Sequence, residues 1–324
     1  MTLDLLQLAA AANLAPSVHN TQPTRWSMGE DGALWLKADL SRQLAVGDAA
    51  GRDIRVSLGA ALEGTVLALA QQGLGVGEID LPHGVPAARA ALRGAASLDP
   101  LTEQMPRRMT WRRLFAAAPV SATQALGKWA AAQADITLVS APNDIEAIST
   151  LNEQTSLLFY RNAPYRRELI SWMRLKRSDP RFGQDGLSAP ALGMSAFEAF
   201  GAGMVLSDAL FGVLDSVGLI APLISERSRT ASASAVLLFH RPSDENPIET
   251  GRALYRRQLQ LSALGFQTWP MSVLADNPQS AAELKARFGI GDDRRLITAW
   301  RVGMLPAGAV VRRERLPAHA LIAA

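Results

Sequence analysis

The chain contains no cysteine, which excludes disulfides, thiolate nucleophiles, iron–sulfur ligation and cysteine-based zinc sites. A P-loop lysine motif is also missing, as is a Gly-x-Gly-x-x-Gly run behind a predicted strand, so the common nucleotide-binding loops are not expected. No pair of histidines has the spacing of a metal site, so no bound transition metal is expected. The chain has four of them: His19, His83, His240 and His319.

Long uninterrupted apolar runs are absent as well. The longest, from Phe200 to Ile224, contains Asp208 and Asp215, and two carboxylates near the centre of a membrane span are costly. We therefore expect a buried or lid-like helical segment there, with no stable insertion into a membrane. The N-terminus has Asp4 early and no basic stretch, unlike a secretory signal peptide. The expected compartment is the cytoplasm.

What is present is typical of a globular protein. The 324 residues are enough for two domains or for one duplicated unit. Hydrophobic residues make up 48% and charged residues 19% of the chain. The formal charge is +3, the calculated pI is 9.6, and arginine far outnumbers lysine. Such an excess suits nucleic acid, a membrane surface or a phosphorylated small molecule, and arginine favours planar, bidentate contacts with anions.

The periodicity of apolar residues predicts helices and strands in both halves of the chain. Helices are predicted over 2–14, 48–73, 121–133, 143–173, 247–265 and 281–289. Strands are predicted over 26–28, 33–38, 77–81, 135–140, 230–240 and 296–302. Residues 82–100 and 179–193 carry little pattern, and the helix at 247–265 is expected to end in a tight loop. A Gly-Arg pair near the start of two helices, at Gly51 and Gly251, is a weak internal echo.

Two segments could carry chemistry. The first is the loop from Pro16 to Pro23, which could either cap the next element or offer Ser17 and Asn20 to a flat polar ligand. The second, "RRMTWRR", starts at Arg107 and is either a solvated basic turn or an anion site. Its interleaved apolar residues favour contact with the protein, and two guanidinium groups flanking Thr110 suit a phosphate. Nucleic acid is the competing anion, but no aromatic platform or repeated basic face accompanies the run.

Other polar groups are weaker candidates. Arg312 and Arg313 follow a predicted strand closely and could close on an anion, whereas Arg315 is expected to be a solvated end of the tail. Ser17 and His19 are too close in one loop to belong to a Ser-His-Asp triad, so hydrolysis is not expected.

Both segments resemble signatures of one family. "APSVHNTQP" resembles the Ala-Pro-Ser-x-x-Asn-x-Gln-Pro signature of the nitroreductase-like flavoproteins, and "RRMTWRRLFAAAPV" resembles their Arg-x-Ser/Thr-x-Arg-x-Phe signature with its following Pro-Val. Ordinary members have the arginine signature first, whereas here the order is reversed. The arrangement is similar to tandem variants of the Acg type, in which two nitroreductase-like halves are fused.

This resemblance implies an α+β protein with a nitroreductase-like fold. Its two fused halves would each have a mainly antiparallel sheet flanked by helices, forming a pseudo-dimer that is a monomer or pairs again as a homodimer. The first half, truncated at its start, would span residues 1–100. The second would span 101–324 and carry a lid-like insertion around 180–230. One composite site would remain, where simple dimers have two.

The resemblance also implies FMN as cofactor, with flavin-centred chemistry and no catalytic side chain. Arg108 and Thr110 would bind the phosphate and ribityl end, and Arg112 would lie near the N1/C2=O edge, where negative charge develops on reduction. Ser17 and Asn20 would hold the other polar edge of the ring. The remaining expected binding residues are Pro16 in the loop, Pro270, Met271 and Ser272 near flavin N5, and Arg312 and Arg313 near the phosphate.

The function so implied is that of an FMN-dependent oxidoreductase working by a ping-pong scheme. NADH or NADPH would deliver hydride to flavin N5, and a small organic acceptor would then take the electrons. An alternative is a protein that sequesters FMN beneath its lid with little or no turnover. A basic nucleic-acid binder is a third and weaker hypothesis.

Overall fold

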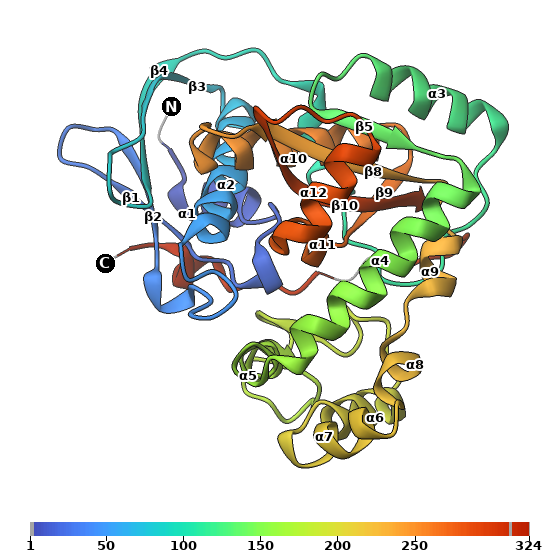
Figure 1. The fold of residues 1–324 in the computed structure, drawn as a ribbon. Coiled ribbons are helices and arrows are strands. Elements are labelled where there is room, and N and C mark those ends of the chain that lie inside the picture. The colour runs from blue at the N-terminus through green and yellow to red at the C-terminus, as the bar shows by residue number, and fades with distance from the viewer. Residues whose placement is uncertain (1–2, 311–312, 324) are drawn as a thin grey trace.

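The computed structural model describes residues 3–310 and 313–323. It contains two four-stranded sheets that lie side by side with a pair of long helices between them (Figure 1). The first sheet is built from β1 (Thr24–Met28), β2 (Leu34–Ala38), β3 (Leu74–Asp80) and β4 (Ala87–Gly94). The second is built from β5 (Ile136–Val139), β8 (Ala235–Pro242), β9 (Phe266–Pro270) and β10 (Arg294–Met304).

The two sheets share one topology. Their strand orders are β1-β2-β4-β3 and β5-β8-β10-β9, and every neighbouring pair is antiparallel. In each sheet a long helix connects the second strand to the third: α2 (Arg52–Gln71) in the first and α10 (Pro247–Ala263) in the second. Each sheet is also preceded by a helix, α1 (Leu5–Ala12) or α3 (Val120–Ala131). These helices and antiparallel sheets confirm the α+β class.

Helices α2 and α10 cross at unusually short range because glycines face each other's backbone. A Cβ atom added to Gly59 would lie 1.9 Å from the carbonyl oxygen of Ile248, and one added to Gly251 would lie 2.0 Å from that of Val56. The contact is therefore reciprocal. The two Gly-Arg pairs that indicated an internal repeat do not occupy equivalent positions. Gly51 precedes α2 as its left-handed cap, whereas Gly251 lies inside α10.

Apolar side chains fill three main layers. One core joins the first sheet to α1 and α2 and includes Trp26, Leu58 and Leu62. The other two lie on opposite faces of the second sheet, where Phe239 stacks on Trp300 and Met271 packs with Leu274. The C-terminal segment returns to the first sheet, since Ile322 bridges to Trp26 and η4 (Ala318–Leu321) packs against α1.

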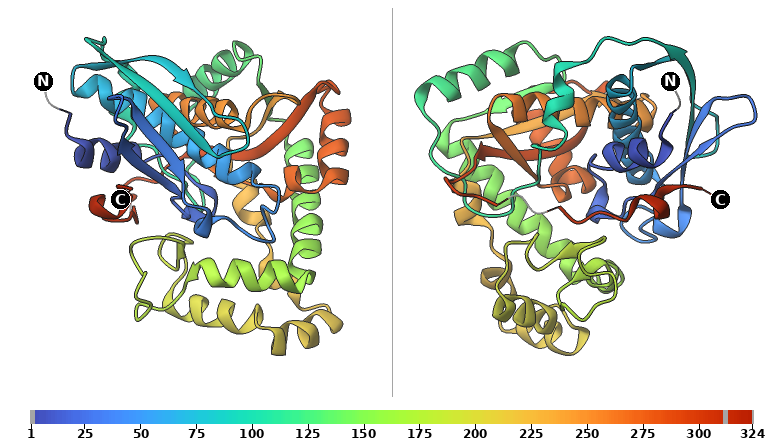
Figure 2. Two further views of the ribbon diagram at one scale, coloured as in Figure 1. Left: turned by 90° about the vertical axis from the view of Figure 1, so that its left-hand side faces the viewer. Right: turned by 180° about the vertical axis from the view of Figure 1, so that it is seen from behind.

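A third group of helices lies below both sheets, as the views in Figures 1 and 2 agree. It comprises α5 (Ala163–Trp172), α6 (Ala196–Val205), α7 (Asp208–Ser216) and α8 (Ile220–Ile224), connected to the sheets by α4 (Pro142–Arg161) and α9 (Arg227–Ala231). We call residues 163–231 the lid. The two-stranded pair β6 (Met173–Arg174) and β7 (Leu187–Ser188) lies within it.

The run from Phe200 to Ile224 is lid-like and largely exposed: Phe200 and Val213 are 64% and 60% exposed, although Phe211 and Ile220 are buried. Among the described residues no single helix is long and apolar enough to cross a membrane, and the one combination that is, α6 with α7, bends by 80°.

Residues 82–100 hold a strand, β4, that the sequence pattern did not predict. A tight turn at Leu264 and Gly265 does follow α10, but the segment after it, which was predicted to be loop, contains β9 from Phe266. The remaining elements are α11 (Val273–Asp276), α12 (Pro278–Arg287), η1 (Val18–Asn20), η2 (Leu40–Arg42) and η3 (Pro100–Gln104).

Candidate functional site

The Pro16–Pro23 loop connects α1 to β1 and has a strained backbone. His19, Asn20 and Gln22 have φ angles of 44°, 55° and 49°, in the left-handed region that residues other than glycine rarely adopt. Such strain is kept where the surrounding structure enforces it, most often at functional sites. Ser17 Oγ accepts a 2.9 Å hydrogen bond from the backbone of Gln22, so its hydroxyl proton remains available to a ligand.

Asn20 fixes this loop to distant parts of the chain. Its amide nitrogen donates to the carbonyl oxygens of Gly186 (3.2 Å) and Glu314 (3.1 Å). Its amide oxygen accepts from Arg315 Nη1 at 2.9 Å. Asn20 therefore connects the loop, the lid and the C-terminal segment, and its side chain has used both of its amide protons.

The segment with the predicted arginine motif runs along β9. Thr110 forms a parallel bridge with Thr268, and the backbone of Trp111 donates to the carbonyl oxygen of Thr268 at 3.1 Å. The backbone of Met109 donates to Gln267 Oε1 at 2.7 Å. The alternative of a solvated basic turn is thereby wrong for the middle of the segment, although Arg107 and Arg113 at its ends are exposed.

Arg108 is the buried cation of this segment, 4% exposed. Its Nη1 donates to Gln258 Oε1 at 3.1 Å, and its guanidinium lies 5.9 Å from the centre of the Tyr255 ring. Its Nε has no hydrogen-bond partner within the described residues. The pKa of Arg108 is lowered to about 10, mainly by burial and also by the nearby Arg313 and Arg112, against the opposing effect of Tyr255. A buried, incompletely paired cation is costly, and a bound anion would relieve that cost.

Two further arginines lie beside it. Arg313 Nη2 donates to the carbonyl oxygen of Arg108 at 2.7 Å, and burial lowers the pKa of Arg313. Burial also lowers the pKa of Arg112 to about 10, an effect that Glu226 opposes. Arg112 has no hydrogen bond or ion pair within the described part of the chain. The predicted residue Arg312 lies outside the described residues.

Arg315 corrects a sequence-based prediction. It was expected to be solvated, but it is half-buried and its Nε donates to the carbonyl oxygen of Asn13 at 2.6 Å. Its other nitrogens donate to Asn20 Oδ1 and to the carbonyl oxygens of Leu14 and Glu314. Burial and, to a smaller extent, the neighbouring Arg108 lower its pKa to about 9. Arg315 thus holds the loop in place from the C-terminal side.

The loop and the arginine segment line two adjoining cavities, of about 440 Å³ and about 330 Å³. The first cavity contains most of the predicted binding residues: Pro16, Ser17, Asn20, Arg108, Thr110, Arg112 and Arg313. The second contains Pro270, Met271 and Ser272. Five residues line both cavities: Pro16, Ser17, Thr110, Arg112 and Leu187. The two cavities therefore form one cleft with the loop on one side and the arginine segment on the other.

The turn after β9 offers one backbone donor to the second cavity. Pro270 has no N–H group, and the N–H of Met271 donates to the carbonyl oxygen of Ala299 at 2.7 Å. Ser272 N–H has no backbone or side-chain acceptor among the described residues. Of the three residues predicted there, Ser272 is thus the one able to bind a ligand through its backbone N–H.

The lid closes one side of this cleft. Leu187 in β7 lines both cavities. Just before it, the fully buried Asp185 accepts from Arg42 Nη1 and Arg174 Nη2, both at 2.9 Å, and pairs with Arg181 Nη2 at 2.8 Å. Arg42 also donates to the carbonyl oxygen of Thr21 in the loop at 2.6 Å. A buried ion cluster therefore fastens the lid to the Pro16–Pro23 loop.

Sequence reasoning missed several polar residues of the second cavity: His19, Asp53, Asn152, Ser156, Tyr160, Tyr165, Glu226 and Asp276. Burial lowers the pKa of His19 to about 4, so its imidazole is neutral. Burial and the neighbouring Asp53 raise the pKa of Asp276 to about 7, against the opposing effect of Arg52. The spacing of Asn152, Ser156 and Tyr160 within the predicted helix was the available signal. Among the described residues no group of three or more acidic or histidine side chains is placed to hold a metal ion.

No family model matches the chain. It is 34% identical over 168 residues to a protein of Mycobacterium tuberculosis named "Putative NAD(P)H nitroreductase", curated in strains CDC 1551 and H37Rv. The match covers 49% of this chain and 47% of that protein, so the chain spans about half the length of the curated relatives it matches.

Solved structures match more loosely. An FMN- and NADPH-dependent nitroreductase from Sphigopyxis sp. strain HMH is 20% identical, with a TM-score of 0.36 over 67% of this chain and 93% of that one. A nitroreductase with bound FMN from Bacteroides fragilis is 12% identical, with a TM-score of 0.38 over 67% and 95%. An FMN-dependent nitroreductase from Mycobacterium smegmatis, in complex with NADPH, has a TM-score of 0.33 over 63% and 86% at 16% identity. The sequence comparison thus makes the chain similar, over about half its length, to nitroreductase-like proteins.

Proposed function

We propose that this protein is an FMN-dependent oxidoreductase of nitroreductase type. One observation carries the proposal: Ser17 of the loop and Thr110 and Arg112 of the arginine segment line the same two adjoining cavities. These residues are far apart in the sequence, and each belongs to a motif that resembles one signature of this family. The curated relatives named as NAD(P)H nitroreductases support the same assignment.

The residues of the first cavity fit the phosphate end of FMN. Arg108 is buried with Nε unpaired among the described residues, and Arg313 contacts its backbone. Low polarity around these cations strengthens their attraction to a phosphate, and the fork geometry of guanidinium suits its oxygens. Arg112 and Ser17, shared with the second cavity, would then contact the polar edges of the ring, and Ser272 N–H would face it from β9.

When bound, FMN supplies the redox chemistry: it takes hydride from NADH or NADPH and passes electrons to a small organic acceptor in alternate half-reactions. The chain itself binds and orients the reactants. Arg112 places a fixed positive charge in the cleft where negative charge develops. The lid, fastened through Asp185, excludes water.

A second function, sequestration of FMN with little turnover, is favoured by that same buried ion cluster. Asp185 is fully buried and bonded to arginines of both the lid and η2. A lid held this firmly would slow the exchange of nicotinamide and acceptor.

The two sheets support a fused-halves architecture, with the first half ending near residue 100. Both sheets have the same strand order and the same placement of helices. Their long helices, α2 and α10, contact each other through a glycine on each side. In such an architecture the loop comes from the first half and the arginine segment from the start of the second. The proposed site is thus composite.

Absorbance of the purified protein and of two neighbouring arginine variants tests the cofactor. Arg108→Ala should lose most of its FMN, whereas Arg107→Ala, one position away but exposed, should keep it. Equal FMN content in both variants, or a wild-type chain that fails to bind added FMN, would refute the proposal. Anaerobic addition of NADH or NADPH then separates the two functions, because rapid bleaching of the flavin indicates an oxidoreductase and persistent colour indicates sequestration.

A further inference from the structure

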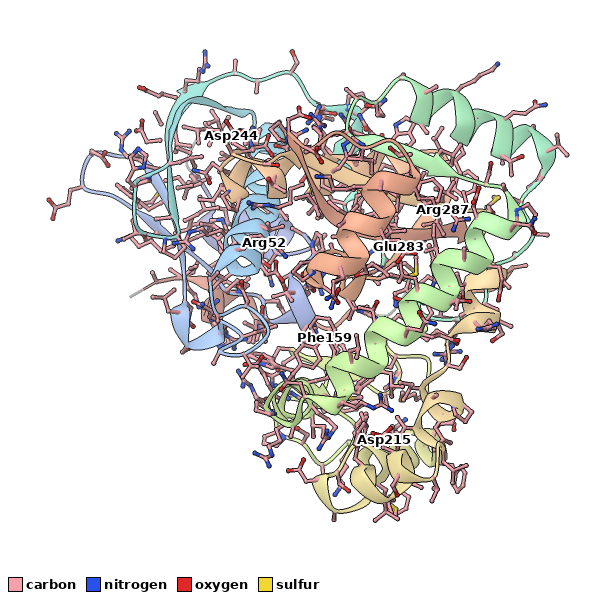
Figure 3. All side chains as sticks on the ribbon, viewed as in Figure 1. Arg52, Phe159, Asp215, Asp244, Glu283 and Arg287 are labelled. Carbon is pink, nitrogen blue, oxygen red and sulfur yellow. The ribbon has the colours of Figure 1, made fainter. Side chains whose placement is uncertain are left out.

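The second cavity has an acidic wall that the FMN site does not explain. Asp53, near the start of α2, and Asp276, at the end of α11, share the single cation Arg52: Nε lies 3.2 Å from Asp53 and Nη2 lies 2.8 Å from Asp276. Both carboxylates line the cavity, whereas Arg52 does not. Two carboxylates against one guanidinium leave one negative charge without a partner. In Figure 3, Arg52 lies near the centre of the molecule.

Neighbouring groups add no compensating charge. Asp48 accepts hydrogen bonds from the backbones of Asp53 and Ile54. On the facing helix α5, Tyr165 is a phenol whose pKa is raised by burial, and Glu168 is bonded to backbone N–H groups of Val46 and Gly47. Burial and the charge of Asp53 raise the pKa of Asp276, and the single cation Arg52, shared by both carboxylates, only partly offsets this effect.

An independent feature of the cavity lining, on α4, points to a ligand. Asn152 on α4 is 3% exposed and lines the cavity, yet its amide has no hydrogen-bond partner among the described residues. Ser156 and Tyr160 follow it on the same helix face, line the same cavity, and also have no side-chain hydrogen bond within the described ranges. These three side chains therefore present their polar groups to the cavity and not to a protein partner, so this face can hydrogen-bond to a molecule that enters it.

The remaining charged groups of the cavity already have a partner or a role. Glu226 pairs with Arg301 Nη2 at 2.6 Å. Arg112 lies at the boundary with the first cavity, where the proposed FMN site uses it. His19 is neutral because burial holds its pKa near 4. The unpaired charge at Asp53 and Asp276 would repel a ligand whose anionic group pointed to this end.

We propose that the second cavity binds a planar aromatic cation bearing N–H donors, with its charge against Asp53 and Asp276. The cavity is also lined by Tyr165, Leu169 and Met271, which suit a flat apolar body, and by the amide of Asn152. The interpretation of this cavity as the acceptor site of the enzyme rests on the proposed function. The inference that the cavity binds such a cation selectively does not rest on it.

The probe is benzamidine, a planar cation with N–H donors, compared with its neutral isostere benzamide and the anion benzoate. Calorimetric titration of the purified protein, with and without bound FMN, should show benzamidine binding at least about tenfold tighter than either. Because a cation displaces the proton of Asp276, benzamidine affinity should rise from pH 5.5 to pH 8 while that of benzamide stays level. Asp276→Asn should weaken benzamidine about tenfold or more and abolish this pH dependence.

The matched control is Asp244→Asn, at an exposed aspartate that lies apart from Arg52 in Figure 3; its affinity for benzamidine should be unchanged. Equal binding of benzamidine and benzamide by the wild type would overturn the inference, and so would its failure to bind benzamidine at either pH. These comparisons need no variant, so they remain decisive if Asp276→Asn does not fold. A colourless protein that takes up no FMN yet selects benzamidine would refute the proposed function and leave the cation site standing.

Discussion

Replacing Asp185 with asparagine should release the lid from the Pro16–Pro23 loop. Asp185 is fully buried and bonded to Arg42, Arg174 and Arg181. Asparagine has nearly the same shape but carries no charge, and one of its two ends is a donor that would face guanidinium groups. The substitution therefore removes the electrostatic contact while leaving the packing almost unchanged.

The size of the effect follows from the burial of this cluster. Breaking a buried ion pair by neutralising one partner costs about 3–5 kcal/mol, since the other charge remains buried. At about 3 kcal/mol, and with about 1.4 kcal/mol for each tenfold change, the population with an open lid would rise roughly a hundredfold. Each sheet has a hydrophobic core of its own, so the loss of stability should be confined mainly to the lid.

Hydrogen–deuterium exchange measures this directly. Peptides covering 173–188 should exchange roughly a hundredfold faster in Asp185→Asn, whereas β8 and β10 should be unaffected. The control is Asp215→Asn, which removes a lid carboxylate bonded to the half-exposed Arg161 on the surface visible in Figure 3 and should leave that exchange unchanged. Unaltered exchange of 173–188 in Asp185→Asn would show that the ion cluster does not hold the lid.

Four other substitutions have defined outcomes. Gly251→Ala would place a Cβ 2.0 Å from the carbonyl oxygen of Val56 and should lower the free energy of unfolding by about 3 kcal/mol or more in a urea titration. Gly127→Ala, with open space around it in α3, should raise it by about 0.5–1 kcal/mol instead. Arg315→Ala should cut FMN occupancy by loosening the loop, and unchanged occupancy in absorbance spectra would contradict that role. Asp276→Asn should raise the melting temperature at pH 8 more than at pH 5, because a raised carboxyl pKa means that its charged form, present above about pH 7, destabilises the folded state; an equal gain at both values would count against it.

Much of the fold could be predicted from periodicity, and the failures have physical causes. Helices α2 and α10 carry strong apolar stripes and were predicted with ends within a few residues. Strand β4 was missed because half of its sequence, "AARAALRG", is alanine, which favours helix and offers no alternation of large apolar and polar side chains. Strand β9 was missed because Pro270 and a glycine before Phe266 suggested a loop.

The site was predictable where a local motif existed and not where partners are distant. Ser17, Arg108 and Thr110 line the predicted cleft because each belongs to a contiguous pattern. The role of Arg315 depends on Asn20, 295 residues away, and no local pattern encodes such a contact. Asp53 likewise looked like an ordinary charge on an amphipathic helix.

In the proposed fused-halves architecture, the repeated topology also explains why one site of this kind would remain. In the first half, residues 13–23 separate α1 from β1 and form the strained loop that lines both cavities. In the second half, α3 ends at Ala131 and β5 starts at Ile136, which leaves room for a tight turn but not for such a loop. The large insertion of the second half, from α4 to α9, lies between β5 and β8 and supplies the lid, Asn152 and Tyr160. One half thus provides the loop and Asp53, and the other provides the arginines, the lid and Asp276, so neither half alone contains a complete cleft.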